Sequence, residues 1–216
     1  MKAAVRHWLV VLLAVTAIAA IVLPAFAYQY PLSATDIRNA YLLGYAKDQE
    51  TSDFFAQYLR LFPAPDSGPH VASITIKTPY AQVAELGKAA ADADVQGAQD
   101  EFANKKIPLL VCVEVDLTAT YPDPASSNPA TIGFLVPDFQ HDFRIQLSQD
   151  GREIEAQPTR VYLLPYGTSS NDTGVSGAIL EVKYDLDKVN PDEMTVKVHT
   201  PDNQHIKTGF DLGHLR

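Results

Sequence analysis

Apolar residues recur at every second position through much of the chain, which is the period of half-buried β-strands. The alternation runs through Leu109–Leu117 and returns downstream, where Asp150-Gly151 separates two such runs as a two-residue hairpin turn. That turn places Leu147 opposite Ile154, so that both apolar side chains share one face. The expected strands lie near residues 72–76, 109–117, 143–147, 161–166, 180–186, 194–198 and 206–212.

Two other stretches have helical spacing. Ser33 to Asp36 resembles a capping box, and the helix that follows is expected to stop at Gly44; a second helix begins at Thr51-Ser-Asp53 and ends at Pro63. We therefore expect an N-terminal helical hairpin over residues 28–62 and a Pro/Gly-rich linker at 63–70. After the first strand, Thr78-Pro79 opens a helical insertion at about 79–105, with a break near Asp92.

The expected fold is α+β and β-rich. About seven strands joined by mostly short turns favour an antiparallel immunoglobulin-like β-sandwich over residues 71–216, with the helical insertion inside it and the helical hairpin before it. An open α+β sheet is the alternative.

The first residues have the pattern of a signal peptide. Lys2 and Arg6 precede an apolar run from Trp8 to Leu23, and Ala25-Phe-Ala27 offers small residues for cleavage before Tyr28. An uncleaved anchor is the competing interpretation, because the apolar stretch is almost long enough to span a bilayer. We expect residues 1–27 to be a signal peptide, and a bacterial periplasmic or secreted protein to result.

The charge balance and the cysteine count limit what the protein can bind. The chain has 216 residues, 17 of them Lys or Arg and 26 Asp or Glu, for a formal charge of −9. This acidic balance argues against nucleic acid, and after signal cleavage it also argues against binding an anionic membrane surface. A single cysteine excludes a disulfide within the chain and a cysteine-based zinc cluster.

Two groups of residues are candidate metal ligands. Pairing Val198 with Ile206 on the core face places His199 opposite His205 on the outer face, close enough for both imidazoles to reach one ion. His214 adds a third ligand only if the tail folds back. Oxygen ligands of the kind calcium prefers gather in and around one loop, at Asp185, Asp187, Asn190 and Asp192, and a smaller cluster contains Asp138, His141 and Asp142. An exposed polar pair and solvated acidic turns are the simpler interpretations, and no cofactor is expected.

Catalytic motifs are absent from the sequence, including Gly-x-Ser-x-Gly, Ser-x-x-Lys and His-Glu-x-x-His. Cys112 has a carboxylate beside it and no histidine close in the sequence, so we expect an unreactive thiol that is packed or half-exposed. Aromatic residues crowd the N-terminal segment; their helical spacing favours core packing, and a docking face is the alternative. These residues are Tyr28, Tyr30, Tyr41, Phe54, Phe55, Tyr58 and Phe62.

These observations favour an exported, non-catalytic protein that acts by binding or assembly with a protein partner in the cell envelope or outside the cell. The runner-up is a metal-assisted or glycan-directed hydrolase whose acidic residues converge in the fold, which requires at least two such groups in one cleft. A third class donates or accepts a strand in a surface assembly, and that class predicts a long unpaired edge strand.

Overall fold

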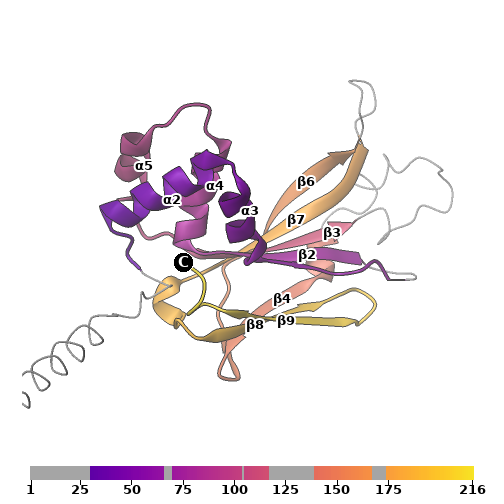
Figure 1. Cartoon of the computed structure of the whole chain (residues 1–216). Coiled ribbons are helices and arrows are strands. Elements are labelled where there is room, and N and C mark those ends of the chain that lie inside the picture. Colours follow the sequence, from indigo (N-terminus) through magenta and orange to yellow (C-terminus); the bar gives the residue numbers. More distant parts are fainter. Residues whose placement is uncertain (1–29, 66–69, 104, 117–138, 167–173) are drawn as a thin grey trace, which may run out of the picture.

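A computed structural model describes residues 30–65, 70–103, 105–116, 139–166 and 174–216 (Figure 1). The fold over these residues is α+β and β-rich, with four α-helices and nine strands in two antiparallel sheets. The expected signal peptide at residues 1–27 lies outside the described residues, as does Asp138. None of the described helices is long and apolar enough to cross a membrane.

The larger sheet has the strand order β1-β2-β3-β7-β6. Its middle strands are long. β3 is buried along most of its length, because the helices cover part of one face of this sheet and the smaller sheet covers the other face. The bounds are β1 Leu59–Leu61, β2 His70–Lys77, β3 Leu109–Asp116, β6 Arg160–Tyr166 and β7 Gly174–Tyr184.

The smaller sheet has the order β5-β4-β8-β9 and lies beneath the larger one in Figure 1. The alternating apolar residues of both sheets belong to one hydrophobic cluster, in which Val113 of β3, Leu147 of β4 and Val196 of β8 are fully buried. The bounds are β4 Arg144–Gln149, β5 Arg152–Ile154, β8 Glu193–His199 and β9 His205–Asp211.

The hairpin between β4 and β5 is the one that the sequence predicts. Leu147 pairs with Ile154, and both turn residues have positive φ, 50° at Asp150 and 75° at Gly151. Those angles are typical of a type I′ turn, whose twist matches that of the flanking strands. This local prediction is confirmed.

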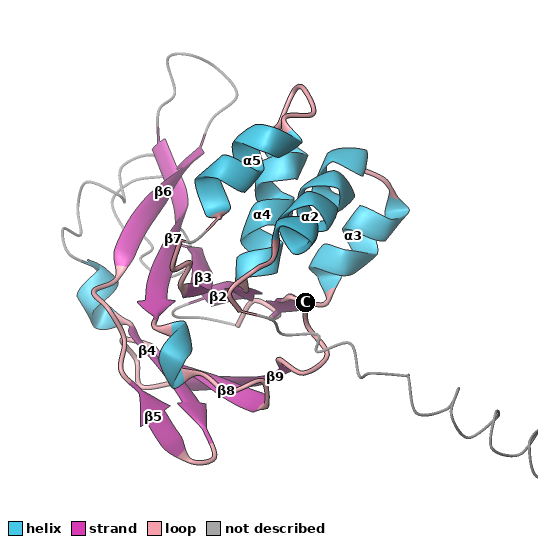
Figure 2. Cartoon of the chain, turned by 90° about the vertical axis from the view of Figure 1, so that its left-hand side faces the viewer, coloured by secondary structure: helices cyan, strands magenta, loops and turns pink. Residues whose placement is uncertain are grey.

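The four helices gather at one end of the two sheets (Figure 2). They are α2 Ala34–Ala46, α3 Gln49–Ala56, α4 Pro79–Ala89 and α5 Val95–Phe102. Ser33 and Asp36 form the expected capping box of α2, and the helical insertion breaks between Ala89 and Val95, as predicted. Two short 3₁₀ helices, Phe139–Asp142 (η2) and Leu186–Lys188 (η3), complete the described elements.

Three local expectations are wrong. Helix α2 does not stop at Gly44, because that glycine lies where α2 crosses α4, and the left-handed residue Lys47 ends the helix instead. Helix α3 begins earlier than Thr51, because the Asp48 side chain caps it. It also ends at Ala56 rather than Pro63, since Leu59–Leu61 form backbone pairs with β2. Pairing with β2 here outweighs the helical spacing of the apolar residues.

The aromatic residues of the helical hairpin mostly pack inward. Tyr41, Phe54 and Tyr58 are buried in the same cluster as the sheet residues. The ring of Phe54 contacts the rings of both Tyr58 and Tyr80, with centroids 4.9 and 5.8 Å apart. For these residues the core interpretation is confirmed, and the alternative of an exposed docking face is wrong.

Candidate functional site

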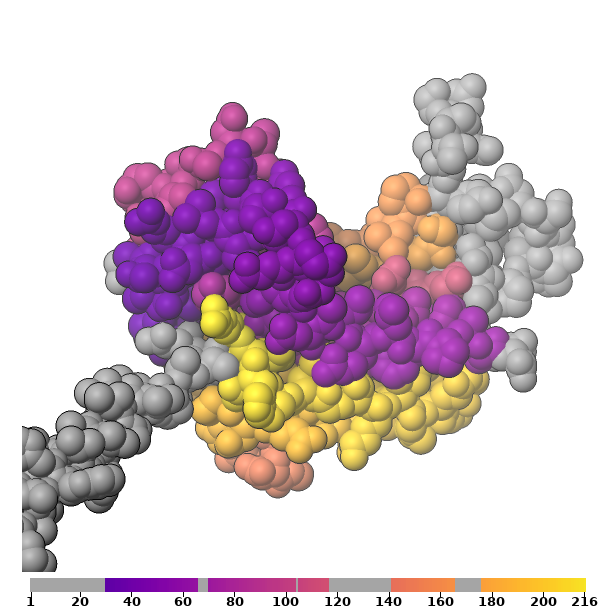
Figure 3. Space-filling model, viewed as in Figure 1, coloured from indigo at the N-terminus to yellow at the C-terminus, as the bar shows by residue number. Residues whose placement is uncertain are grey.

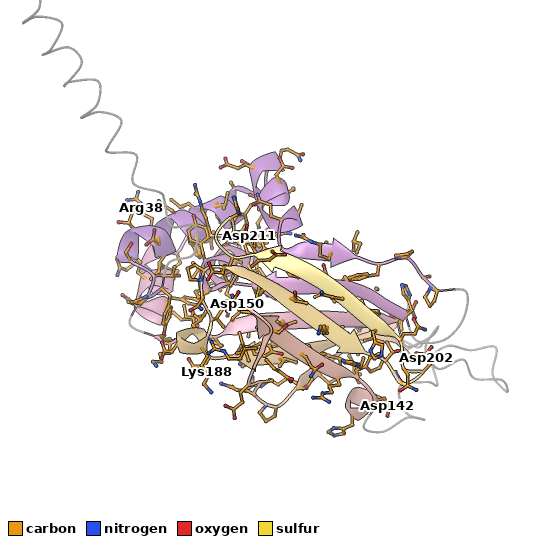
Figure 4. The ribbon with its side chains drawn as sticks, turned by 90° about the horizontal axis from the view of Figure 1, so that it is seen from below. Arg38, Asp142, Asp150, Lys188, Asp202 and Asp211 are labelled. Carbon is orange, nitrogen blue, oxygen red and sulfur yellow. The ribbon has the colours of Figure 1, made fainter. Side chains whose placement is uncertain are left out.

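The two histidines singled out from the sequence lie opposite each other on neighbouring strands. Val198 pairs with Ile206 and His199 with His205, so the predicted register is confirmed. The two residues flank the β8–β9 turn that contains Asp202, labelled at one end of the smaller sheet in Figure 4. Their Nδ1 atoms are 2.7 Å apart, a hydrogen-bond distance, and the two rings are nearly perpendicular at 84°.

A chain of hydrogen bonds extends from this pair across the outer face of the smaller sheet. His199 Nε2 lies 2.9 Å from Gln146 Oε1 on β4, and Gln146 Nε2 donates to Glu153 Oε2 on β5 over 2.9 Å. The four residues therefore come one from each strand of the sheet. Glu153 also lies 3.9 Å from Arg144, which is paired with His199 in the strand register. We call this set the four-strand chain.

The surroundings of His199 disfavour its charged form. Desolvation lowers the pKa of His199, and electrostatic interactions with His205, Arg144 and Lys197 lower it further, against a smaller opposing effect of Glu153. His199 is thus held neutral near neutral pH, which leaves one of its ring nitrogens as an acceptor.

The acidic loop does not form a cluster of free carboxylates. Asp185 accepts a hydrogen bond from the backbone N–H of Asp187, and Asp187 Oδ2 lies 2.5 Å from Lys106 Nζ. At Asp192 it is the backbone carbonyl that accepts hydrogen bonds, from the Leu212 N–H and the Gln149 side chain. Over the described residues, no group of three or more His, Cys, Asp and Glu side chains could hold a metal ion.

His214 has a different partner. Its Nδ1 lies 2.6 Å from Asp211 Oδ2, three residues earlier in the chain. His141 and Asp142 lie in η2, whereas the third member of that predicted group, Asp138, lies outside the described residues. The structure therefore brings together His199 and His205 among the predicted ligands.

A cavity of about 410 Å³ contains the carboxylates most relevant to the hydrolase alternative. Glu153, Glu155 and Asp187 line it, together with Arg152, Ile154 and Lys188. Lys188 Nζ lies 2.7 Å from Glu155 Oε2, and that hydrogen bond and charge lower the pKa of Glu155. A glycosidase acid needs a carboxyl group whose pKa is raised. The shift at Glu155 has the opposite sign, so this cavity does not favour the hydrolase alternative.

Cys112 lies on β3 and is buried. Desolvation raises the pKa of its thiol to about 12, with a smaller opposing effect of Lys77. A nucleophilic cysteine needs a lowered pKa, so the expectation of an unreactive thiol agrees with this environment.

The apolar edge of the larger sheet is a further feature of the surface. β6 is an edge strand, and two of its central side chains are among the most exposed large apolar groups that the structure describes: Tyr162 at 47% and Leu163 at 50%. The β6–β7 ribbon stands apart from the helices across a hollow in the surface (Figure 3). Alternation along a strand places these two side chains on opposite faces of the sheet.

Sequence reasoning missed Gln146 and Glu153, the partners of the histidine pair. Strand alternation places Gln146 on the polar face of β4, which was a usable signal, but its approach to His199 depends on β4 pairing with β8.

Comparison with models of protein families, with curated proteins and with solved structures finds no match for this chain.

Proposed function

We propose that this protein is exported and acts by binding an extended segment of a partner protein along β6, the edge strand of the larger sheet among the described strands. The observation that carries the proposal is the exposed apolar centre of that edge, at Tyr162 and Leu163. An edge strand presents unpaired backbone N–H and C=O groups, and an added strand satisfies them while pockets between alternate side chains give specificity.

Comparison of the four sheet edges supports the choice of β6. β1 and β5 are only three residues long, which limits what can pair with them. β9 is seven residues long but carries exposed Lys207 at its centre, and lysine on an edge opposes further pairing. β6 is equally long, and its charged residue, Arg160, and its proline, Pro165, lie near its two ends. Its centre thus has none of these protective features.

We further propose that the two sheets form an immunoglobulin-like sandwich. The strand order supports this: with β2 as strand A, the run β2-β3-β7-β6 corresponds to A-B-E-D, and β5-β4-β8-β9 corresponds to C′-C-F-G. Helices α4 and α5 are then an insertion between strands A and B. The inter-sheet disulfide of antibody domains has no counterpart, because Cys112 is the single cysteine. A crystal structure with a different strand order would refute this assignment.

Export rests on residues 1–27, whose charged start, apolar run and Ala25-Phe-Ala27 site are typical of a cleaved signal peptide. Mass spectrometry of the protein purified from its own host is expected to find Tyr28 as the first residue. A protein that retains Met1 would contradict cleavage.

The strand-addition proposal is tested by site-specific photo-crosslinking in the host envelope, with the crosslinker at position 162. The matched control carries it at position 61, because Leu61 is 74% exposed on β1, at the opposite edge of the same sheet. We expect one partner protein to be captured from position 162 and not from 61. The variant Leu163→Lys should abolish capture, and Leu61→Lys should leave it unchanged. Equal capture from both positions, or capture that survives Leu163→Lys, would refute the proposal.

A further inference from the structure

We propose that His199 and His205 together bind one divalent copper ion through their Nδ1 atoms. The site lies on the outer face of the smaller sheet, away from the β6 edge, so it is independent of the function proposed above. It is built by the register of the β8–β9 hairpin, which holds the two Nδ1 atoms 2.7 Å apart.

The four-strand chain fixes which nitrogen of His199 is available. Gln146 Nε2 donates to the Glu153 carboxylate, so the amide of Gln146 must present its oxygen to His199. An amide oxygen only accepts hydrogen bonds, and therefore His199 Nε2 carries the proton and Nδ1 carries the lone pair. Histidine ligands of metals usually have this arrangement, with the second ring nitrogen donating to an acceptor that orients the ring.

The hydrogen between the two rings must be displaced before an ion can bind both Nδ1 atoms. Because His199 Nδ1 accepts, His205 Nδ1 must donate to it in the metal-free pair. When copper binds, His205 loses the proton on Nδ1 and takes one from water on Nε2, so the ring stays neutral and no net proton is released. Both Nδ1 lone pairs then face the ion. His205 is exposed, so its ring can rotate to complete this change.

The short separation selects the metal. With metal–nitrogen bonds of roughly 2.0–2.1 Å, two nitrogens at a right angle lie about 2.9 Å apart, whereas a tetrahedral angle separates them by about 3.3 Å. The right-angle geometry requires the smaller movement from 2.7 Å. Tetragonal coordination with right angles is typical of Cu²⁺, which also binds nitrogen ligands most strongly among the divalent first-row metals. Water would occupy the remaining positions.

The charges near the pair are partly balanced. Arg144 and Lys197 lie on neighbouring positions of the same face and oppose a cation, but the Glu153 carboxylate lies 3.9 Å from Arg144 and offsets its charge. Glu153 therefore has two functions here: it orients the Gln146 amide, and it reduces the repulsion between Arg144 and the ion.

The test is titration of the metal-free protein with Cu²⁺, Ni²⁺ and Zn²⁺ by calorimetry, with electron paramagnetic resonance of the copper complex. We expect one Cu²⁺ per chain, a spectrum of an ion bound by two imidazole nitrogens, and affinity that falls from Cu²⁺ to Ni²⁺ and Zn²⁺. His199→Ala and His205→Ala should each weaken copper binding at least tenfold and leave one imidazole or none in the spectrum. Gln146→Leu, which removes the orienting acceptor, should weaken binding by roughly tenfold.

The matched control is His214→Ala, which removes an exposed histidine paired with Asp211 and should leave copper binding unchanged. Circular dichroism of each variant checks that it is folded; His205→Gln, which keeps a polar side chain at the exposed position, replaces His205→Ala if the latter is not. Copper binding that persists in both histidine variants, or tighter binding of Zn²⁺ than of Cu²⁺, would overturn the proposal.

Discussion

The crossing of α2 and α4 allows a sharp prediction about the variant Gly44→Ala. A Cβ atom built on Gly44 would lie 1.8 Å from the carbonyl oxygen of Ala84 and 2.9 Å from the backbone nitrogen of Lys88. Both atoms belong to the backbone of α4, so no side-chain rotation relieves the overlap. The contact is mutual, since a Cβ on Gly87 would lie 2.1 Å from the carbonyl oxygen of Tyr41.

The expected effect is the difference of two opposing contributions. Alanine is favoured over glycine inside a helix by about 1 kcal/mol. Overpacking a rigid contact costs about 1–3 kcal/mol, and the short distances here indicate the upper part of that range. The net loss in the free energy of unfolding is then about 2 kcal/mol. For a chain of this size, that corresponds to a fall in Tm of about 4–8 °C.

Thermal unfolding followed by circular dichroism measures this change, with Asn39→Ala as the control. Asn39 is exposed on the same helix, so its replacement tests helix propensity without the crossing, and its Tm should change little or rise slightly. An unchanged or higher Tm for Gly44→Ala would refute the close crossing of α2 and α4. A milder loss for Gly44→Ala than for a Gly44→Val variant is expected, because the larger side chain separates the helices further.

Three further predictions concern buried groups and metals. In urea unfolding, Tyr58→Phe should lower the free energy of unfolding by about 1 kcal/mol, because the Tyr58 hydroxyl donates to a backbone oxygen of Arg216 over 2.6 Å. Tyr184→Phe should be neutral or stabilising, because the buried Tyr184 hydroxyl has no hydrogen-bond partner among the described residues, and equal losses in the two variants would contradict this reasoning. Because burial raises the pKa of Cys112 to about 12, alkylation of its thiol by iodoacetamide in the folded protein should be slow at pH 8 and become faster as the pH rises, and rapid labelling at pH 8 would contradict the burial. The contribution of this thiol to stability is complete below about pH 9 and should be lost as the pH rises towards 12. A strong chelator should leave the protein folded, because the candidate ligands lie on an exposed hairpin and the hydrophobic core is shared by both sheets. Any Cu²⁺ removed from His199 and His205 lowers Tm only by its own binding free energy, and loss of the folded state on chelation would show that folding depends on a metal.

Local patterns in the sequence were sufficient for the features that depend on one hairpin. Strand alternation and the Asp150-Gly151 turn predict the pairing of Leu147 with Ile154, and the same reasoning predicts that His199 faces His205. In both cases the partners are close in the sequence, so the turn and the apolar face together determine the register.

Features that depend on distant elements were not predictable in this way. Glycine is typical of the position just after the end of a helix, and only the close approach of α4 explains why Gly44 lies inside α2. Leu59 and Phe62 continue a helical pattern, but Leu59–Leu61 pairs with β2 instead. The exposure of Leu163 follows from the place of β6 at the edge of the sheet, and the order of strands is not encoded in the alternation of any one of them.

The contacts of the C-terminal residues have a consequence for the order of folding. A backbone oxygen of Arg216 accepts hydrogen bonds from Tyr58 and from Thr78, residues 158 and 138 positions earlier, and the neighbouring Leu215 is buried. Tyr58 follows α3 and Thr78 precedes α4, so both hydroxyls gain this partner only when a segment 138 or more positions later in the chain has folded against them. Contacts between such distant positions slow folding, because the entropy of closing the loop is lost before the contact forms. The contact between Arg216 and the helical end of the molecule is thus expected to form last, after β9 has joined the smaller sheet.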